Sequence, residues 1–243
     1  MLSIKPYLQE IQYKKEEVDT TDKYPFNIPF LQQLEKIEFH PDVTFLVGEN
    51  GAGKSTLIEA IAVGLGFSKE GGTKNFNVET ADTTSELHQY FKFIRGFKKP
   101  SDYYFLRAES FYNIATYMDE VGYLRSYGGK SLHEQSHGES FFAVIKNKLH
   151  GKGLYIFDEP EAALSPNRQL AAVAAIHKLV QNDSQFIIAT HSPIIMAYPN
   201  AKILLLNEAG LQEVAFEDTE HFQVYDSFFK NYKGMIHHLI NSE

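Results

Sequence analysis

The sequence predicts an α/β protein with a mainly parallel sheet flanked by helices. Two short runs, 154–157 and 186–189, are apolar at every position, which is typical of parallel strands buried on both faces. The segment between them, 167–180, has apolar residues at helical spacing. Strands that alternate with helices along a chain favour parallel strands joined by crossover helices.

The first third of the chain predicts two strands, a glycine-rich loop and a helix. The strands are expected at 37–39 and 43–47, as part of a β-rich N-terminal edge. After the loop at 48–56, apolar residues recur at helical spacing over 57–65. The order strand, glycine loop, helix is therefore predicted here.

Residues 68–140 are expected to form a small, partly helical insert, with residues 1–67 and 141–243 as the core. The insert begins with a polar, turn-rich stretch. Further expected elements are a helix or strand within 86–97, a strand at 103–106, a helix within 111–124, a helix at 141–149, the strand at 154–157, a helix at 167–180 capped by Ser165 and Pro166, the strand at 186–189, and a hairpin of 203–206 with 211–215.

The composition is that of an ordinary globular protein, with 243 residues, 43% hydrophobic and 22% charged. No apolar run reaches the roughly 18 residues that a membrane helix needs, and the chain start lacks a secretory pattern. We therefore expect a cytoplasmic protein without an integral membrane segment. The absence of cysteine excludes disulfides and a thiolate zinc site. The net charge of −8 disfavours a broad grip on nucleic acid, although a local basic cluster is formed by Lys92, Arg95, Lys98 and Lys99.

A glycine-rich motif carries the clearest chemistry. Gly48 to Ser55 matches the P-loop pattern G-x-x-x-x-G-K-S, with a predicted strand before it and a helix after it. Its backbone N–H groups can converge on phosphate oxygens, and the helix that begins at Lys54 directs its positive end toward the same anion. We expect Lys54 to reach the β- and γ-phosphates and the Ser55 hydroxyl to bind Mg²⁺. The nucleotide-binding candidates are Gly48, Glu49, Asn50, Gly51, Ala52, Gly53, Lys54, Ser55 and Thr56.

Two carboxylates follow the buried strand at 154–157. Asp158 is expected at the carboxyl edge of the sheet, where ligand sites of α/β proteins lie, and to bind Mg²⁺, through water. Glu159 is then positioned as the general base that deprotonates the attacking water. An acidic strand end is common by itself, but its pairing with a P-loop favours the catalytic interpretation.

Together these motifs resemble an ABC (ATP-binding cassette) ATPase. The resemblance is carried by the strand end Asp158-Glu159-Pro160, the following Ala163-Leu164-Ser165-Pro166 and a later strand that leads to His191. It implies ATP hydrolysis with Mg²⁺, a D-loop at about 161–165, and a catalytic role for His191 as the switch histidine that contacts the γ-phosphate. The stretch 105–111 also looks like small stand-alone bacterial ABC-type proteins described as predicted ATPases.

Residues 136–140, Ser-His-Gly-Glu-Ser, resemble the ABC signature, whose usual form is Leu-Ser-Gly-Gly-Gln. Ser136 and Gly138 would be its phosphate-facing pair, whereas Gln135, His137 and Glu139 depart from the usual residues. In the family this motif contacts ATP on the partner subunit, which implies an ATP-dependent homodimer. Too few residues separate Lys54 from Ser136 for the long arms of a chromosome-type ATPase.

Two positions of the ABC pattern stay open. No glutamine follows the predicted strand at 103–106, where the resemblance calls for the Q-loop, and Arg107 or Glu109 occupies that region. An aromatic residue that stacks on the base is equally undecided. The candidates Tyr24, Phe26 and Phe30 are explained as well by core packing.

A zinc-protease pattern overlaps the signature. His133-Glu134-Gln135-Ser136-His137 fits H-E-x-x-H, which needs both imidazoles on one face of a continuous helix. Gly128-Gly129 and Gly138 flank the pattern and disfavour that helix. We therefore expect no zinc site.

Three functions remain open at this point. The preferred one is a stand-alone, ATP-switched homodimer that acts on an unidentified protein or nucleic-acid partner. The second is the nucleotide-binding subunit of an ABC membrane transporter, which the altered signature and the missing Q-loop glutamine disfavour. The third, a binding module without turnover, is disfavoured by the presence of both Asp158 and Glu159.

Overall fold

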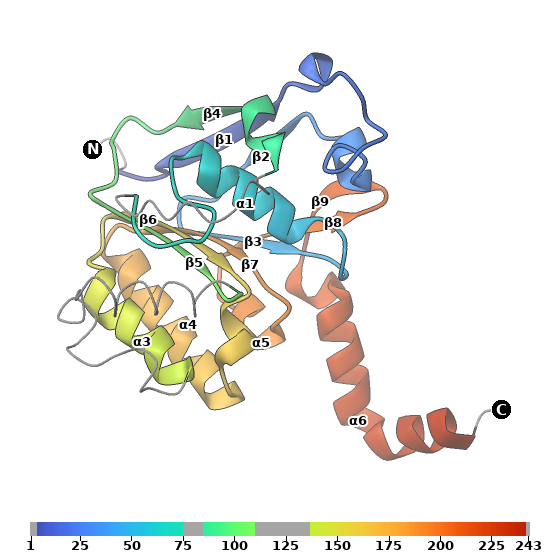
Figure 1. The fold of residues 1–243 in the computed structure, drawn as a ribbon. Helices are drawn as coiled ribbons and strands as arrows, with labels where there is room; N and C mark the ends of the chain where they lie inside the picture. The colour runs from blue at the N-terminus through green and yellow to red at the C-terminus, as the bar shows by residue number, and fades with distance from the viewer. Residues whose placement is uncertain (1–3, 75–84, 110–136, 242–243) are drawn as a thin grey trace.

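The computed structural model describes residues 4–74, 85–109 and 137–241, and its strands form two sheets (Figure 1). The larger sheet has the order β5-β6-β7-β3-β8-β9 and is parallel from β5 to β8, with β9 antiparallel to β8. The smaller sheet has the antiparallel order β2-β1-β4. The strands are β1 (Leu8–Tyr13), β2 (Lys36–Glu38), β3 (Val43–Val47), β4 (Phe91–Arg95), β5 (Asp102–Arg107), β6 (Gly153–Asp158), β7 (Gln185–Ala189), β8 (Lys202–Asn207) and β9 (Gly210–Val214).

The larger sheet is covered on both faces. On one face, helix α1 (Lys54–Gly64) and the smaller sheet pack with strand residues such as Leu46 and Ile187. On the other face, strand residues such as Phe45 and Ile188 pack with the helices of the second layer (Figure 1). Both sets of alternating residues are buried, which explains why the strands are apolar throughout. The second layer consists of α3 (His137–Lys148), α4 (Pro166–Gln181) and α5 (Pro193–Met196).

The predicted fold class, a mainly parallel α/β sheet flanked by helices, is confirmed. The β-rich N-terminal edge is the smaller sheet. The segment at 86–97 divides into a 3₁₀ helix (Glu86–Tyr90) followed by β4. Strand β1 and the long helix α6 (Glu220–Asn241) were not predicted from the sequence. The helix expected within 111–124 lies outside the described residues.

Part of the predicted insert at 68–140 belongs to the two sheets. β4 pairs with β1, and β5 pairs with β6 from Asp102, opposite Gly153, to Arg107, opposite Asp158. The pairing of β5 places Arg107 at the same sheet edge as the predicted catalytic carboxylates. The division into a core (1–67 and 141–243) and an insert otherwise stays a prediction.

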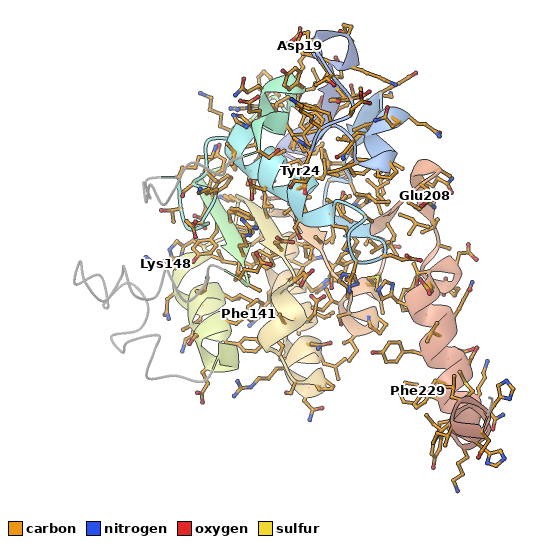
Figure 2. All side chains as sticks on the ribbon, turned by 45° about the vertical axis from the view of Figure 1, so that its right-hand side comes forward. Asp19, Tyr24, Phe141, Lys148, Glu208 and Phe229 are labelled. Carbon is orange, nitrogen blue, oxygen red and sulfur yellow. The ribbon has the colours of Figure 1, made fainter. Side chains whose placement is uncertain are left out.

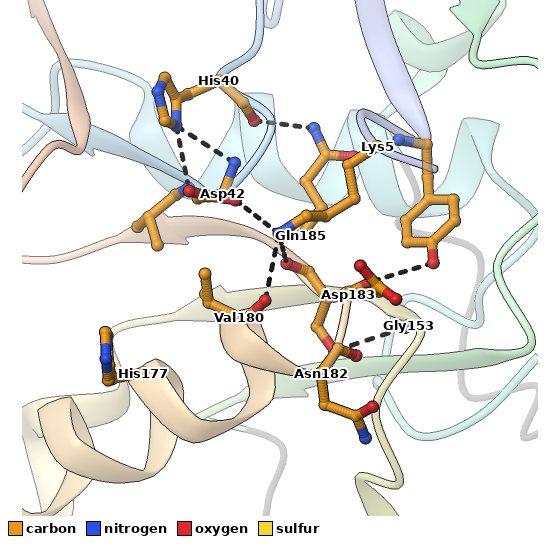
Figure 3. Close-up of polar contacts among 12 residues, drawn as sticks. Lys5, His40, Asp42, Gly153, His177, Val180, Asn182, Asp183 and Gln185 are labelled. Carbon is orange, nitrogen blue, oxygen red and sulfur yellow. Dashed lines mark hydrogen bonds and ion pairs between the residues drawn. The ribbon is translucent and has the colours of Figure 1, made fainter. Parts of the chain in front are cut away.

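The amino-terminal segment is held at the edge of the sheet where the strands begin (Figure 3). The ammonium group of Lys5 lies 2.5 Å from Oδ1 of Asp42, which directly precedes β3. The side-chain amide of Gln185, the first residue of β7, accepts from the N–H of Leu8 and donates to the carbonyl oxygens of Leu8 and His40. These contacts all lie at the end of the sheet opposite the P-loop.

Helix α6 leaves the body of the protein and projects from it (Figure 1). Near its start, the rings of Phe222 and Phe216 contact each other with centroids 5.0 Å apart. Beyond that point many of its large apolar side chains, Phe229 among them, are exposed (Figure 2), and Asn231 interrupts the helical backbone. Across the described ranges, no helix is both long enough and apolar enough to cross a membrane.

Candidate functional site

The predicted P-loop, residues 48–56, connects β3 to α1 and has a backbone that only glycine allows at two points. Gly48 and Gly53 have φ angles of 152° and 94°. A Cβ atom on Gly48 would lie 2.4 Å from the carbonyl oxygen of Leu206, and one on Gly53 would lie 2.7 Å from Cγ2 of Ile28. Glycine at these positions therefore lets the loop pass close to β8 and to the segment before β2.

Lys54 is buried within this loop. Its ammonium group donates hydrogen bonds to the carbonyl oxygens of Gly48 and Glu49, both at 2.8 Å. Burial lowers the pKa of Lys54, and the nearby carboxylates of Glu159 and Asp158 oppose that shift. The Lys54 ammonium group is thus held at the amino end of α1. Its positive charge and the helix dipole both favour an anion at this position.

Ser55 and Asp158 form an oxygen pair beside Lys54. The Ser55 hydroxyl donates to Oδ1 of Asp158 at 3.2 Å, although the two residues are 103 positions apart in the chain. Asp158 is the last residue of β6, and burial raises its pKa to about 6. A buried carboxylate next to a hydroxyl fits Mg²⁺, which prefers oxygen ligands and would compensate the buried negative charge.

Arg107 lies beside this pair, at the carboxyl end of β5. Its Nη1 atom is 2.8 Å from Oε2 of Glu59 on α1, and its Nε atom is 3.8 Å from Oδ2 of Asp158. The Arg107 guanidinium partly opposes the rise in the Asp158 pKa. Glu109, the other residue considered for the Q-loop position, has an exposed side chain that pairs with Arg107. Of the two, Arg107 is the one that contacts the site.

Glu159 and His191 face each other across the ends of β6 and β7. The backbone of Glu159 is left-handed, with φ 50° and ψ 53°, and its N–H donates to the carbonyl oxygen of Ala189 at 2.9 Å. The Glu159 carboxylate lies 3.7 Å from Nε2 of His191. That Nε2 atom is buried and has no hydrogen-bond partner among the described residues. Burial and the charge of Lys54 lower the pKa of His191.

Two further side chains at this site were missed at the sequence level. The buried carboxylate of Glu161 accepts a hydrogen bond from the backbone N–H of His191 at 2.5 Å. Burial raises the pKa of Glu161. Nδ1 of His191 lies 3.1 Å from Nε2 of His221, in the first turn of α6. The position of Glu161 within the D-loop stretch was a usable signal, whereas no sequence pattern points to His221.

The structure separates the three aromatic candidates for base stacking. Phe26 and Phe30 are buried in the core below the loop, so core packing accounts for both. Tyr24 is 66% exposed (Figure 2), and its hydroxyl lies 3.0 Å from Oγ1 of Thr56. It lines a cavity of about 490 Å³ together with Gly51, Gly53, Lys54, Ser55, Thr56 and Glu159, among others. Tyr24 is therefore the remaining candidate for contact with the base.

Replacing Tyr24 by alanine is expected to weaken ATP binding about tenfold, because base–aromatic stacking contributes about 1–3 kcal/mol. The Tyr24→Phe variant keeps the ring and should retain affinity within about twofold. Titration with inorganic triphosphate, which has no base, is the second arm, and its affinity should not change in Tyr24→Ala. Equal losses for ATP and triphosphate would show that Tyr24 does not stack on the base.

Of the predicted signature pair Ser136 and Gly138, the structure describes Gly138. Gly138 is buried in the first turn of α3, and a Cβ atom there would lie 2.1 Å from Nη1 of Arg168 on α4. It does not line the cavity beside the P-loop within the described part of the chain. Ser136 lies outside the described residues, as do the first four residues of the zinc-protease pattern, 133–136, whereas its last residue, His137, begins α3.

Comparisons with known proteins identify relatives of this architecture. Residues 26–189 match the model of a family described as AAA domain, whereas no curated protein matches the chain. Similar solved structures include CbiO1 from Clostridium perfringens, part of the ABC transporter complex CbiONQ, with 17% identity, a TM-score of 0.51 and coverage of 86% of this chain and 91% of that chain. An ABC transporter in an inward-facing conformation has 16% identity, a TM-score of 0.51 and coverage of 90% and 88%. The SMC head domain from Thermotoga maritima has 16% identity, a TM-score of 0.47 and coverage of 86% and 98%.

Proposed function

This chain belongs to the AAA-domain family and is an ABC-type P-loop ATPase, and on that premise we propose that it hydrolyses Mg²⁺-ATP as an ATP-switched homodimer. The observation that carries the proposal is the convergence of Lys54, Ser55, Asp158, Glu159 and His191 at one edge of the sheet. These residues provide a cation, an oxygen pair, a base and a polar imidazole. Phosphoryl transfer from ATP to water needs this set of groups.

In the proposed reaction, Lys54 exchanges its hydrogen bonds with the loop carbonyl oxygens for oxygens of the β- and γ-phosphates. Ser55 and Asp158 would hold Mg²⁺, and the bound ion would neutralise negative charge on the phosphate oxygens. Glu159 accepts a proton from the attacking water, so that the water oxygen bonds to the γ-phosphorus. The bond to the bridging oxygen breaks, and that oxygen leaves on ADP with the electron pair. The Nε2–H group of His191 donates a hydrogen bond to a γ-phosphate oxygen and keeps its proton.

The exposure of the catalytic group supports a dimer. The Glu159 side chain is 42% exposed in the single chain, whereas phosphoryl transfer requires a site from which bulk water is excluded. In the ABC resemblance, Ser136 and Gly138 of one protomer cover the nucleotide of its partner. Two such contacts related by a two-fold axis would enclose two ATP molecules, so that ATP strengthens the dimer.

A nucleotide-binding subunit of an ABC transporter is the alternative. Two of the similar structures come from ABC transporters, and at 16% and 17% identity they show the fold alone. Arg107 stands where the resemblance calls for the glutamine that couples ATP state to a membrane partner. We therefore place a stand-alone cytoplasmic ATPase first, acting on a protein or nucleic-acid partner.

The test is equilibrium binding of a labelled, non-hydrolysable ATP analogue, combined with phosphate release from Mg²⁺-ATP. The wild type should bind and hydrolyse, and Lys54→Ala should weaken binding about 10- to 100-fold, because charge-assisted hydrogen bonds contribute about 1.5–3 kcal/mol. Lys98→Ala removes an exposed lysine and is the matched control, expected to bind as the wild type does. Failure of the wild type to bind the analogue, or unchanged binding by Lys54→Ala, would contradict the proposed function.

A further inference from the structure

Helix α6 contacts the catalytic edge through an imidazole pair. Nε2 of His221 lies 3.1 Å from Nδ1 of His191, and the ring centroids are 5.3 Å apart. His221 is the second residue of α6, and it also lines a cavity of about 520 Å³ with P-loop residues 48–52. His221 of the projecting helix α6 thus contacts His191, the residue that lies beside Glu159.

The hydrogen bond between the two imidazoles contains a single proton, which either ring can carry. Burial lowers the pKa of both histidines, which favours the neutral form of each ring. In a neutral imidazole one nitrogen donates and the other accepts. The protonation of His191 at Nδ1 therefore decides what its Nε2 atom can do.

The surroundings of Nε2 favour one of the two arrangements. Nε2 of His191 is buried 3.7 Å from the Glu159 carboxylate and has no hydrogen-bond partner in the described part of the chain. A lone pair on this nitrogen would face the negative charge of Glu159, whereas an N–H would be attracted to it. The proton of His191 therefore belongs on Nε2. Its Nδ1 atom then accepts, and Nε2 of His221 is the donor.

We propose that His221 is a positioning residue that holds His191 in the Nε2–H tautomer, with this N–H on the side of Glu159. Its catalytic meaning rests on the proposed function, in which this N–H donates to a γ-phosphate oxygen. Because His221 lies in the first turn of α6, a displacement of α6 would remove the donor from His191. The position of α6 and the hydrogen-bonding state of the catalytic edge are linked through this contact.

The first test measures the tautomer directly, without nucleotide. Long-range ¹⁵N–¹H correlation spectra of histidine-labelled protein distinguish a protonated from an unprotonated ring nitrogen. The wild type should show His191 protonated at Nε2, with Nδ1 shifted as a hydrogen-bond acceptor. Protonation of His191 at Nδ1 would overturn the proposal. This measurement is independent of ATP hydrolysis, so a protein without turnover would refute the proposed function and still decide the tautomer.

The second test compares two variants of His221. Glutamine places an amide donor near the position of Nε2, whereas leucine fills the space without a donor. His221→Leu should lose the acceptor shift of Nδ1 and lower kcat about 10- to 100-fold, the range for groups that orient a ligating imidazole. The KM for ATP should change less than about threefold, and His221→Gln should restore most of kcat. Equal losses of kcat in both variants, with unchanged spectra of His191, would show a structural role only.

Discussion

Replacing Glu159 by glutamine is expected to lower the rate of ATP hydrolysis about 10²- to 10⁴-fold, the usual contribution of a general base. The amide has nearly the shape of the carboxylate but cannot accept a proton from water. Affinity for ATP should be retained, because Lys54 and the P-loop are unchanged. Removing the negative charge beside His191 should even favour the bound γ-phosphate. Phosphate release under saturating Mg²⁺-ATP is the measurement.

The same variant should trap the closed dimer. Hydrolysis is the step that would remove the γ-phosphate from between the protomers, so its loss leaves ATP bound and the dimer associated. Sedimentation of Glu159→Gln at micromolar concentration should show a monomer without nucleotide and a dimer with Mg²⁺-ATP. The double variant with Lys54→Ala is the matched control and should remain monomeric in both conditions. A monomer for Glu159→Gln in both conditions would refute the sandwich mechanism.

Replacing Asp158 by asparagine is expected to stabilise the nucleotide-free protein while abolishing Mg²⁺-dependent hydrolysis. The folded protein raises the pKa of Asp158 from 3.8 to about 6 because the carboxylate is buried. That shift corresponds to about 3 kcal/mol of free energy disfavouring the charged form in the folded state. Asparagine removes the charge and can still accept from Ser55, so most of this free energy should be regained.

The pH dependence follows from the sign of that shift. Because the folded pKa lies above the unfolded one, the folded state binds more protons between pH 3.8 and about 6. The contribution of Asp158 therefore becomes destabilising as pH rises through this window and is constant above it. The difference in unfolding free energy between Asp158→Asn and wild type should be about 1–3 kcal/mol at pH 8 and fall to about 0.5 kcal/mol near pH 4. Urea denaturation at both pH values measures it.

An exposed carboxylate provides the control for that experiment. Asp226→Asn on α6 removes the partner of Lys230, an exposed pair one helical turn apart. Such pairs contribute about 0.2–0.5 kcal/mol, so the control should change stability only slightly. A lower stability of Asp158→Asn than of wild type at pH 8 would contradict the expected effect of burial.

The sequence was sufficient for the parts of the fold whose signals are local. Strands buried on both faces have to be apolar throughout, so β6 and β7 could be identified from their residues alone. β1 has the mixed sequence Leu-Gln-Glu-Ile-Gln-Tyr, and its buried residues become recognisable only when β2 and β4 pair with it. No residue of α6 is fully buried, so its apolar residues do not show the pattern of a helix packed on the core.

The same distinction holds for the site. The P-loop and the Asp158-Glu159 pair lie in contiguous motifs, and their places could be predicted. The choice of Arg107 over Glu109 depends on the register between β5 and β6, which the sequence does not encode locally. His221 lies 30 residues from His191 in the chain and meets it only because α6 starts beside the P-loop. Contacts of this kind need the tertiary structure.

The left-handed backbone of Glu159 has a consequence for how such a chain would change over generations. Residues with a side chain rarely adopt φ near 50°, and asparagine or glycine occupies this conformation at lower cost. The neighbouring Asp158 also lowers the stability of the folded state, because its carboxylate is buried. Mutation without selection for phosphoryl transfer would drift toward asparagine or glycine at position 159 and toward asparagine at position 158, since these changes would stabilise the fold. A lineage that had abandoned ATP turnover should lose this carboxylate pair early, well before its apolar strands.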